Sequence, residues 1–166
     1  IVTHDQEEAM IVADRIAVMD RGRLAQVATP EELYERPNSR WFADFIGEVS
    51  LLEGRFSAPG VFQSMIGRIE VADKTATLGE TAWLALRPEK IRLGMERPAD
   101  AANAVAGTVF ETGYRGDRSV HKVRLADRSL MKVAVPNTAA RGERNVAAGD
   151  VVWLSWPADA GVVLTQ

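Results

Sequence analysis

Beyond Gly47 the sequence is a series of short apolar or alternating runs, each closed by glycine, proline or polar turn residues. An alternation with period two places successive side chains on opposite faces of a strand, and runs of this length are typical of strands. Many short strands at close spacing favour a mainly β domain, which we expect to be a small β-barrel. The predicted strands are residues 50–56, 64–71, 82–86, 91–93, 104–110, 119–125, 130–135, 151–156 and 161–165.

The first 47 residues carry stronger helix signals than the rest of the chain. Thr29 is followed by a proline in the first turn and by Glu32, which together form a capping box. Ser39 caps another helix, which ends at Gly47. We therefore expect a short α/β unit at 1–47 and a β domain at 48–166. The elements predicted in the first unit are a buried strand end at 1–3, a helix at 5–13, a hairpin of strands at 15–20 and 23–27 that is covered on both faces, and helices at 29–36 and 39–46.

The bulk composition excludes several classes of function. The 166 residues contain no cysteine, which rules out a disulfide framework and a thiolate metal site. The formal net charge is −3, whereas nucleic-acid binders usually carry a basic excess on one face. No apolar stretch approaches the roughly 20 residues that a membrane-spanning helix needs. We therefore expect no metal site and no nucleic-acid partner.

His4 stands between the predicted strand end and the helix that follows it. One interpretation is an incidental histidine before a capped helix. The other interpretation is functional, because ligands of open α/β sheets gather beyond the carboxyl ends of the strands. An imidazole at that edge can donate a hydrogen bond to a phosphate oxygen or orient an attacking water. The spacing alone leaves both interpretations open.

Three acidic residues, Asp5, Glu7 and Glu8, follow the histidine closely. A carboxylate pair or a metal site is one interpretation, but the three residues do not all share one helix face. Two overlapping capping boxes, Thr3-x-x-Gln6 and Asp5-x-x-Glu8, account for them as residues that offset the helix dipole. We therefore assign these acids to helix capping and solvation.

Several stretches around and after His4 point to a family. Residues 2–10 read VTHDQEEAM and residues 13–23 read ADRIAVMDRGR, followed by ATPEELYERP at 28–37 and FADFIGEV at 42–49. This order closely resembles the switch-histidine region of ABC importer ATPases. In that family a Gly-Thr-Pro-type turn, a short helix and a second helix ending in Phe-Ile-Gly come next. Ala28 stands where the family usually has the glycine of the turn.

The resemblance implies a catalytic role for His4. In the family this histidine contacts the γ-phosphate of ATP and helps to hold the hydrolytic water, inside a site shared by two nucleotide-binding domains. The phosphate-binding loop, the aspartate–glutamate pair and the signature sequence of such a site do not occur in this sequence. We therefore expect His4 to bind ATP, with Mg²⁺, only in a longer dimeric protein. By itself the chain, which starts Ile1-Val2-Thr3, is expected to be an inactive C-terminal part without a bound cofactor.

The β domain resembles the transport-associated OB-type (TOBE) domain of the same ATPases. The matching stretches are LRPEKI at 86–91, GTVF at 107–110, YRGD at 114–117 and VLT at 163–165. OB barrels often bind oligonucleotides or sugars. The aromatic content of 7% and the acidic charge balance disfavour a nucleic-acid face here.

Among these ATPases the tail is most similar to polyamine importers, through ALRPEKI at 85–91, SVHKVRL at 119–125 and the closing residues 156–165. The resemblance implies a homodimer joined through the regulatory domain and partnership with transmembrane permease subunits. It also implies an indirect partnership with a periplasmic binding protein and a peripheral position at the cytoplasmic face of the membrane. A sulfate, iron or sugar importer and a stand-alone ligand-sensing module remain the alternatives.

Other polar and aromatic residues receive structural interpretations. The triplet Arg87-Pro88-Glu89 could sense a ligand, but we favour a role in satisfying backbone groups or an internal ion pair. His121 is expected at an outward position of its strand. Trp153 and Trp156 fall on opposite faces of one strand, so one of them is expected in the core. Loops are expected at 95–103, between two halves of the β domain, and at 137–149.

Overall fold

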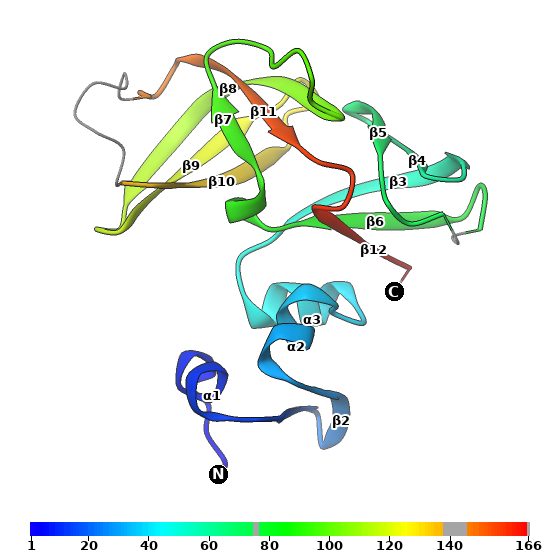
Figure 1. Ribbon diagram of the computed structural model, residues 1–166, viewed down its shortest axis with the longest axis vertical. Coiled ribbons are helices and arrows are strands. Elements are labelled where there is room, and N and C mark those ends of the chain that lie inside the picture. The colour runs from blue at the N-terminus through cyan, green and yellow to red at the C-terminus, as the bar shows by residue number, and fades with distance from the viewer. Residues whose placement is uncertain (75–76, 138–145, 166) are drawn as a thin grey trace.

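Among the described residues the α-helices lie at the N-terminal end of the chain, and two antiparallel sheets of five strands make up most of the remainder (Figure 1). The computed structural model describes residues 1–74, 77–137 and 146–165, so most of the predicted loop at 137–149 lies outside the described residues. The elements are α1 (Gln6–Val12), β1 (Ile16–Asp20), β2 (Arg23–Ala28), α2 (Pro30–Glu35), α3 (Arg40–Ile46), β3 (Ser50–Ala58), β4 (Val61–Ser64), β5 (Gly67–Glu70), β6 (Thr81–Leu86), the 3₁₀ helix η1 (Pro88–Lys90), β7 (Arg92–Gly94), β8 (Asn103–Tyr114), β9 (Arg118–Arg124), β10 (Leu130–Pro136), β11 (Val151–Trp156) and β12 (Gly161–Leu164).

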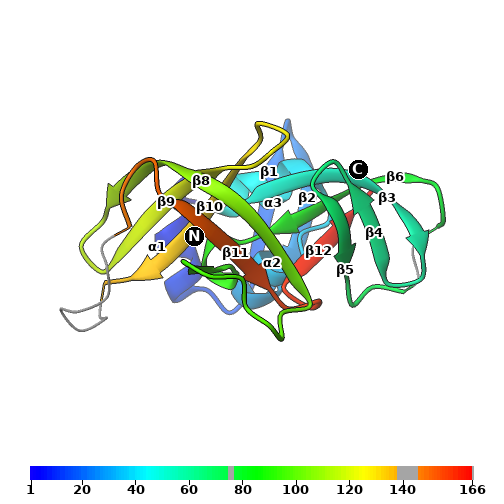
Figure 2. The same cartoon turned by 90° about the horizontal axis from the view of Figure 1, so that it is seen from above.

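The two larger sheets are interleaved along the chain. One has the strand order β12-β6-β3-β4-β5 and the other β10-β9-β8-β11-β7. The chain thus leaves the first sheet after β6, builds the second sheet, and returns to add β12 beside β6 (Figure 2). The mainly β fold class is confirmed. The pairing of the described strands gives two open sheets, and no closed barrel is found among them.

Two predicted segments differ from the structure. Residues 95–103 join β7 to β8 within one sheet, whereas the change of sheet occurs at η1 and again at 157–160. Proline explains the first change, because Pro88 cannot continue the hydrogen-bond ladder of β6. The predicted strand at 64–71 is a hairpin of β4 and β5, since Gly67 adopts a φ of 115° at the turn between them.

One hydrophobic core lies between the two large sheets, and polar side chains link them at its edges. Asn103 of β8 accepts a hydrogen bond from the Glu70 backbone N–H at 2.7 Å and donates one to the Glu70 carbonyl at 2.9 Å. Trp156 is buried and Trp153 is half-buried, as their opposite positions on β11 predicted. The fully buried large side chains of this core are Phe62, Leu84, Leu86, Val109, Val123, Met131, Val133, Val152 and Leu154.

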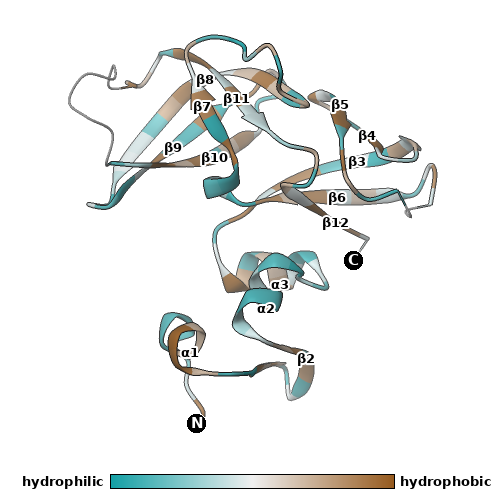
Figure 3. Cartoon of the chain, viewed as in Figure 1, coloured by the Kyte–Doolittle hydropathy of each residue, from teal (hydrophilic) through white to brown (hydrophobic). Residues whose placement is uncertain are grey.

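The N-terminal unit has a smaller core of its own, made by Val18, Leu33, Phe42 and Ile46. The predicted covered hairpin is covered on one face only, since Met19 is 58% exposed. The predicted strand end at 1–3 is also not observed, because no strand among the described residues pairs with it. Figure 3 shows apolar colouring on α1 and β2, at the end of the molecule that lies away from the large sheets.

His121 faces inward and is 6% exposed, contrary to the outward position expected for it. Residues two apart in a strand share a face, and Val123 is fully buried in the core. The Nδ1 atom of His121 lies 2.9 Å from the hydroxyl oxygen of Thr112 on β8. Burial lowers the pKa of His121 below its usual value, so the fold favours the neutral imidazole.

The buried histidine predicts a loss of stability in mild acid. Because the pKa is lower in the folded than in the unfolded state, the unfolded chain takes up more protons as the pH falls below about 6.5. The urea midpoint should therefore fall between about pH 7 and about pH 5, and this fall should be smaller in His121→Gln. The exposed histidine supplies the matched control, since His4→Gln should keep the full decrease. An undiminished decrease in His121→Gln would exclude this origin.

Candidate functional site

His4 lies on the surface, immediately before the residue that caps α1. Asp5 is the N-cap and accepts a hydrogen bond from the Glu8 backbone N–H at 3.0 Å. Thr3 accepts from the Asp5 backbone N–H at 3.0 Å and donates to the Glu8 carboxylate at 3.1 Å. Asp5 therefore caps α1 as predicted, but the predicted capping box is only half formed, because the Asp5 backbone N–H and the Glu8 carboxylate both bind the Thr3 hydroxyl instead of each other. No hydrogen bond or ion pair joins the His4 side chain to any described residue.

Arg87 forms the most extensive polar contact between the N-terminal unit and the β domain. Its Nη1 donates to the carbonyl oxygens of Ala43 and Gly47 at 2.9 Å and of Glu48 at 3.1 Å. Its Nη2 donates to the Tyr34 carbonyl at 3.3 Å. The last carbonyls of a helix have no partner within the helix. One buried guanidinium thus satisfies the C-terminal end of α3 and also reaches the end of α2.

Gly47, the residue after α3, packs closely against the Tyr34 ring. Its φ of 167° is extended backbone that any residue can adopt. A Cβ atom at Gly47 would lie 3.1 Å from the Tyr34 ring and 3.5 Å from Arg87 Nη1. The glycine that was predicted to end the helix therefore also leaves space for the Tyr34 ring.

Tyr34 and Glu89 complete the contact next to Arg87. The Tyr34 hydroxyl donates to Glu89 Oε1 at 2.6 Å, and the Arg87 guanidinium lies 4.2 Å from the centre of the Tyr34 ring. Burial and the hydrogen bond to Glu89 raise the pKa of Tyr34 to about 12, so the phenol remains protonated at neutral pH. Lys90 and Glu35 form a further ion pair across this junction between the N-terminal unit and the β domain. The structural interpretation of Arg87 and Glu89 agrees with these contacts.

Glu48 joins the start of the β domain to its second sheet. Its carboxylate accepts from Arg115 Nη2 at 2.7 Å and lies 3.4 Å from Lys132 Nζ. Burial alone would raise the pKa of Glu48, but the two cations outweigh that effect and hold the pKa below its usual value. Glu48 is therefore ionised at neutral pH and pairs with Arg115, which follows β8, and with Lys132 of β10.

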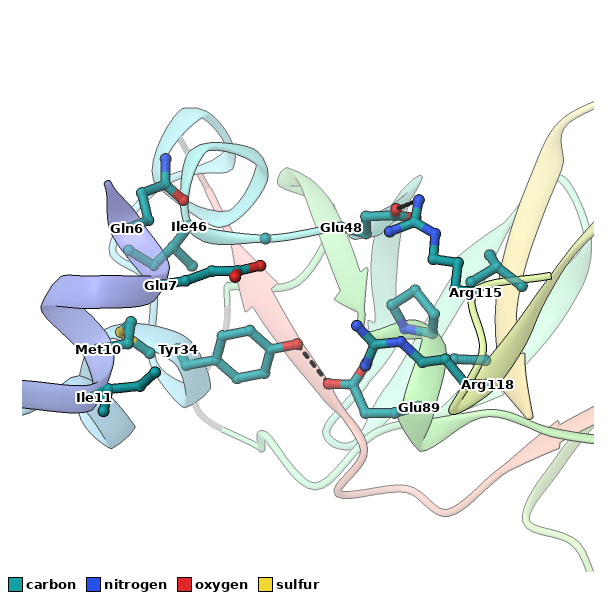
Figure 4. A pocket seen from close by; sticks show the side chains of 14 residues that line it. Gln6, Glu7, Met10, Ile11, Tyr34, Ile46, Glu48, Glu89, Arg115 and Arg118 are labelled. Atoms are coloured by element: carbon teal, nitrogen blue, oxygen red, sulfur yellow. Dashed lines mark hydrogen bonds and ion pairs between the residues drawn. The ribbon is translucent and has the colours of Figure 1, made fainter. Parts of the chain in front are cut away.

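A cleft of about 480 Å³ lies between α1, the end of α3, η1 and the hairpin of β8 and β9 (Figure 4). Part of its lining is apolar, with Met10 and Ile46 from the N-terminal unit and Val120 from β9. The Tyr34–Glu89 hydrogen bond crosses its lower side in Figure 4, and Glu7 points into it from α1. In this cleft the segment that follows His4 faces the β domain.

Sequence reasoning missed Tyr34, Glu48 and Arg115 as parts of this junction. Tyr34 and Glu89 are 55 positions apart, and Arg115 and Glu48 are 67 positions apart. Periodicity and capping act over a few residues, so they carry no signal for such pairs. The usable signal was the isolated arginine before Pro88, at the end of an otherwise apolar strand.

Within the ranges that the structure describes, no group of three or more acidic or histidine side chains is placed to hold a metal ion. In the same ranges, no helix has the length and apolar character needed to cross a membrane.

Comparison with known proteins gives a consistent picture. Residues 84–164 match the TOBE domain family. The chain is 39% identical, over 99% of its length, to the putrescine transport ATP-binding protein PotG of Escherichia coli, covering 46% of that protein. It is 37% identical, over 99% of its length, to the spermidine/putrescine import ATP-binding protein PotA of Chromobacterium violaceum, covering 48% of it. The chain thus spans about half the length of these relatives.

A solved structure supports the fold of the β domain. The cytoplasmic molybdate-binding protein ModG superposes with a TM-score of 0.62, covering 69% of this chain and 94% of ModG, at 13% sequence identity. This likeness concerns the fold alone. The TOBE match at residues 84–164 and the alignment of 99% of the chain with PotG and PotA make this chain similar to the TOBE-containing part of such ATP-binding proteins.

Proposed function

We propose that this chain is the C-terminal part of the ATP-hydrolysing subunit of an ABC importer for polyamines such as putrescine or spermidine. The observation that carries the proposal is the similarity over 99% of the chain to two proteins named for transport of these compounds. Residues 1–47 would then be the end of the nucleotide-binding domain, and residues 48–166 the regulatory domain. The separate small core of the N-terminal unit supports this division.

In this proposal His4 is the residue of the chain that meets the nucleotide. Its exposed position, and the lack of a partner for its side chain among the described residues, fit a contact with a group outside this chain. ATP, held with Mg²⁺ by other parts of the protein, would supply the phosphoryl group. His4 would donate a hydrogen bond to the γ-phosphate or orient the attacking water. The exposed apolar residues Ile11, Met19 and Leu24 also fit burial against the rest of such a domain.

The remaining assignments follow from the same proposal. Permease subunits in the membrane would be direct partners, a periplasmic binding protein would be an indirect partner, and the subunit would lie at the cytoplasmic face. ATP-driven closure of the dimer would shift the permeases between inward- and outward-facing states. The hydrogen bonds of Arg87 would hold the regulatory domain against the end of the nucleotide-binding domain, so that the two would move together.

Uptake of labelled putrescine tests the substrate class. A strain that lacks the full-length protein should lose uptake, and the wild-type gene should restore it. The His4→Ala gene should not restore uptake, whereas the Arg92→Gln gene should, because Arg92 is an exposed residue of β7. Normal putrescine and spermidine uptake in the deletion strain, with loss of sulfate, iron or sugar uptake instead, would overturn the polyamine assignment.

Self-association of the regulatory domain is a second expected result. If residues 48–166 join two subunits, the chain should sediment as a mixture of monomer and dimer whose dimer fraction rises with concentration. Interfaces of weak or transient complexes bury less surface than stable ones, so we expect weak association. Sedimentation of a strict monomer over a hundredfold range of concentration, up to roughly millimolar, would count against this interface.

A further inference from the structure

The cleft between α1 and the β domain contains charged groups that no contact within the described residues neutralises. Glu7 on α1 and Arg118 at the start of β9 both line it, and neither side chain makes a hydrogen bond or ion pair with a described residue. Glu89 uses one carboxylate oxygen to accept from Tyr34, and its other oxygen has no such partner in the described ranges. The cleft therefore holds two charged side chains without a partner among the described residues, Glu7 and Arg118, and the Glu89 carboxylate, which lies near Arg87 and keeps one oxygen without a hydrogen bond.

The remaining charges at the cleft are already matched. Arg115 also lines it, but its guanidinium is bound to Glu48 at 2.7 Å. The Arg87 guanidinium is buried, bonded to four carbonyls and stacked over the Tyr34 ring. A ligand would consequently meet Glu7 and Glu89 as acceptors and Arg118 as the available cation.

The surface between these charged groups is apolar. Met10 and Ile46 contribute from the N-terminal unit, and Val120 and Ala134 contribute from the second sheet. A volume of about 480 Å³ lies within the range of small-molecule sites, which combine an apolar lining with a few placed polar groups. A guanidinium binds a carboxylate through two parallel hydrogen bonds, and a carboxylate accepts from an ammonium group.

We propose that this cleft binds a small amino-acid zwitterion with an apolar body, its ammonium group at Glu7 and Glu89 and its carboxylate at Arg118. Figure 4 shows Glu7 entering from α1 and Arg118 entering from the opposite side. A bound zwitterion bridges the helix that begins directly after His4 and the first strand residue of the β9 hairpin. The bound ligand thus holds α1 against the β domain. The binding is argued from the cleft alone and does not rest on the proposed function.

Four probes of the same six-carbon skeleton test the site. L-norleucine and ε-aminocaproate carry both charges at different separations, hexylamine carries only the ammonium, and hexanoate only the carboxylate. In calorimetric or NMR titrations of the chain, at least one zwitterion should bind about tenfold more tightly than both singly charged probes. Glu7→Gln and Arg118→Gln should each weaken that zwitterion about tenfold. The exposed control Arg92→Gln, which lies outside the cleft, should not weaken it.

Three outcomes would overturn the inference. Equal or tighter binding of hexylamine would make the cleft a site for cations alone. Binding that survives both Glu7→Gln and Arg118→Gln would place the ligand elsewhere. Absence of saturable binding by all four probes would exclude the site. Glu7 and Arg118 are exposed and make no hydrogen bond or ion pair with a described residue, and loss of the first-turn acid Glu7 should cost α1 no more than about 1 kcal/mol, so both variants should remain folded. None of these outcomes affects the expected ATP turnover of His4→Ala, so the two proposals fail separately.

Discussion

Replacing Arg87 with methionine should lower the free energy of unfolding of the chain by about 3 kcal/mol or more. Methionine fills a similar volume, so the loss measures hydrogen bonding rather than a cavity. Four carbonyl oxygens, those of Tyr34, Ala43, Gly47 and Glu48, lose their donor. A buried carbonyl without a partner costs about 1–3 kcal/mol, and these costs do not add fully for neighbours.

The variant Arg87→Lys separates the contribution of the positive charge from that of the hydrogen-bonding geometry of the guanidinium. Burial already lowers the pKa of Arg87, although Tyr34 and nearby carboxylates oppose that effect. A lysine there keeps a positive charge but lacks the planar fork that reaches several acceptors at once. We therefore expect Arg87→Lys to recover only a minor part of the stability that Arg87→Met loses.

Urea unfolding, followed together with amide hydrogen exchange, measures this effect. Exchange should accelerate most in α2 and α3, whose ends lose their donors, and less in the core strands of the large sheets. Arg92→Met is the matched control, because Arg92 is exposed and its loss should change the free energy of unfolding by less than about 0.5 kcal/mol. A stability of Arg87→Met within that same margin of wild type would show that the junction is not held by this side chain.

Local elements of the fold could be predicted because their causes lie within a few residues. Thr29 and Glu32 form the predicted capping box, and Ser39 caps α3 as expected. The strands from β6 to β12 lie close to their predicted bounds, because alternation and turn residues specify them, except that β8 continues to Tyr114, four residues beyond its predicted end. The interleaved order of the two sheets could not be predicted in the same way, since no local pattern states which strands pair.

The failures have equally specific causes. The N-terminal residues read as a buried strand because Ile1 and Val2 are apolar, but burial requires a partner surface that the described residues do not provide. His121 was placed outward because a histidine is polar, although the fully buried Val123 shares its face of β9. The cleft was missed entirely, because Glu7, Glu89 and Arg118 come from three elements that only the folded chain brings together.

The His4→Ala variant of the full-length protein should lose at least about 100-fold in ATP turnover, which is the lower end of the contribution of a general acid or base. The affinity for ATP should stay close to wild type, because other parts of the protein would hold most of the nucleotide. The fold should also be unaffected, since the His4 side chain is exposed and makes no contact that stabilises α1. The α1 cap is formed by Asp5, which the substitution leaves intact.

The most direct test of the proposed identity is steady-state ATP hydrolysis by wild type, His4→Ala and His121→Gln, each with nucleotide binding measured in parallel. His121→Gln removes the other histidine of the chain from a place in the β domain that has no proposed role in hydrolysis. We expect normal ATP binding in all three proteins, near-normal turnover in His121→Gln, and turnover close to background in His4→Ala. Wild-type turnover in His4→Ala, with the protein folded and ATP bound, would contradict the assignment of this chain to the switch-histidine region of an importer ATPase.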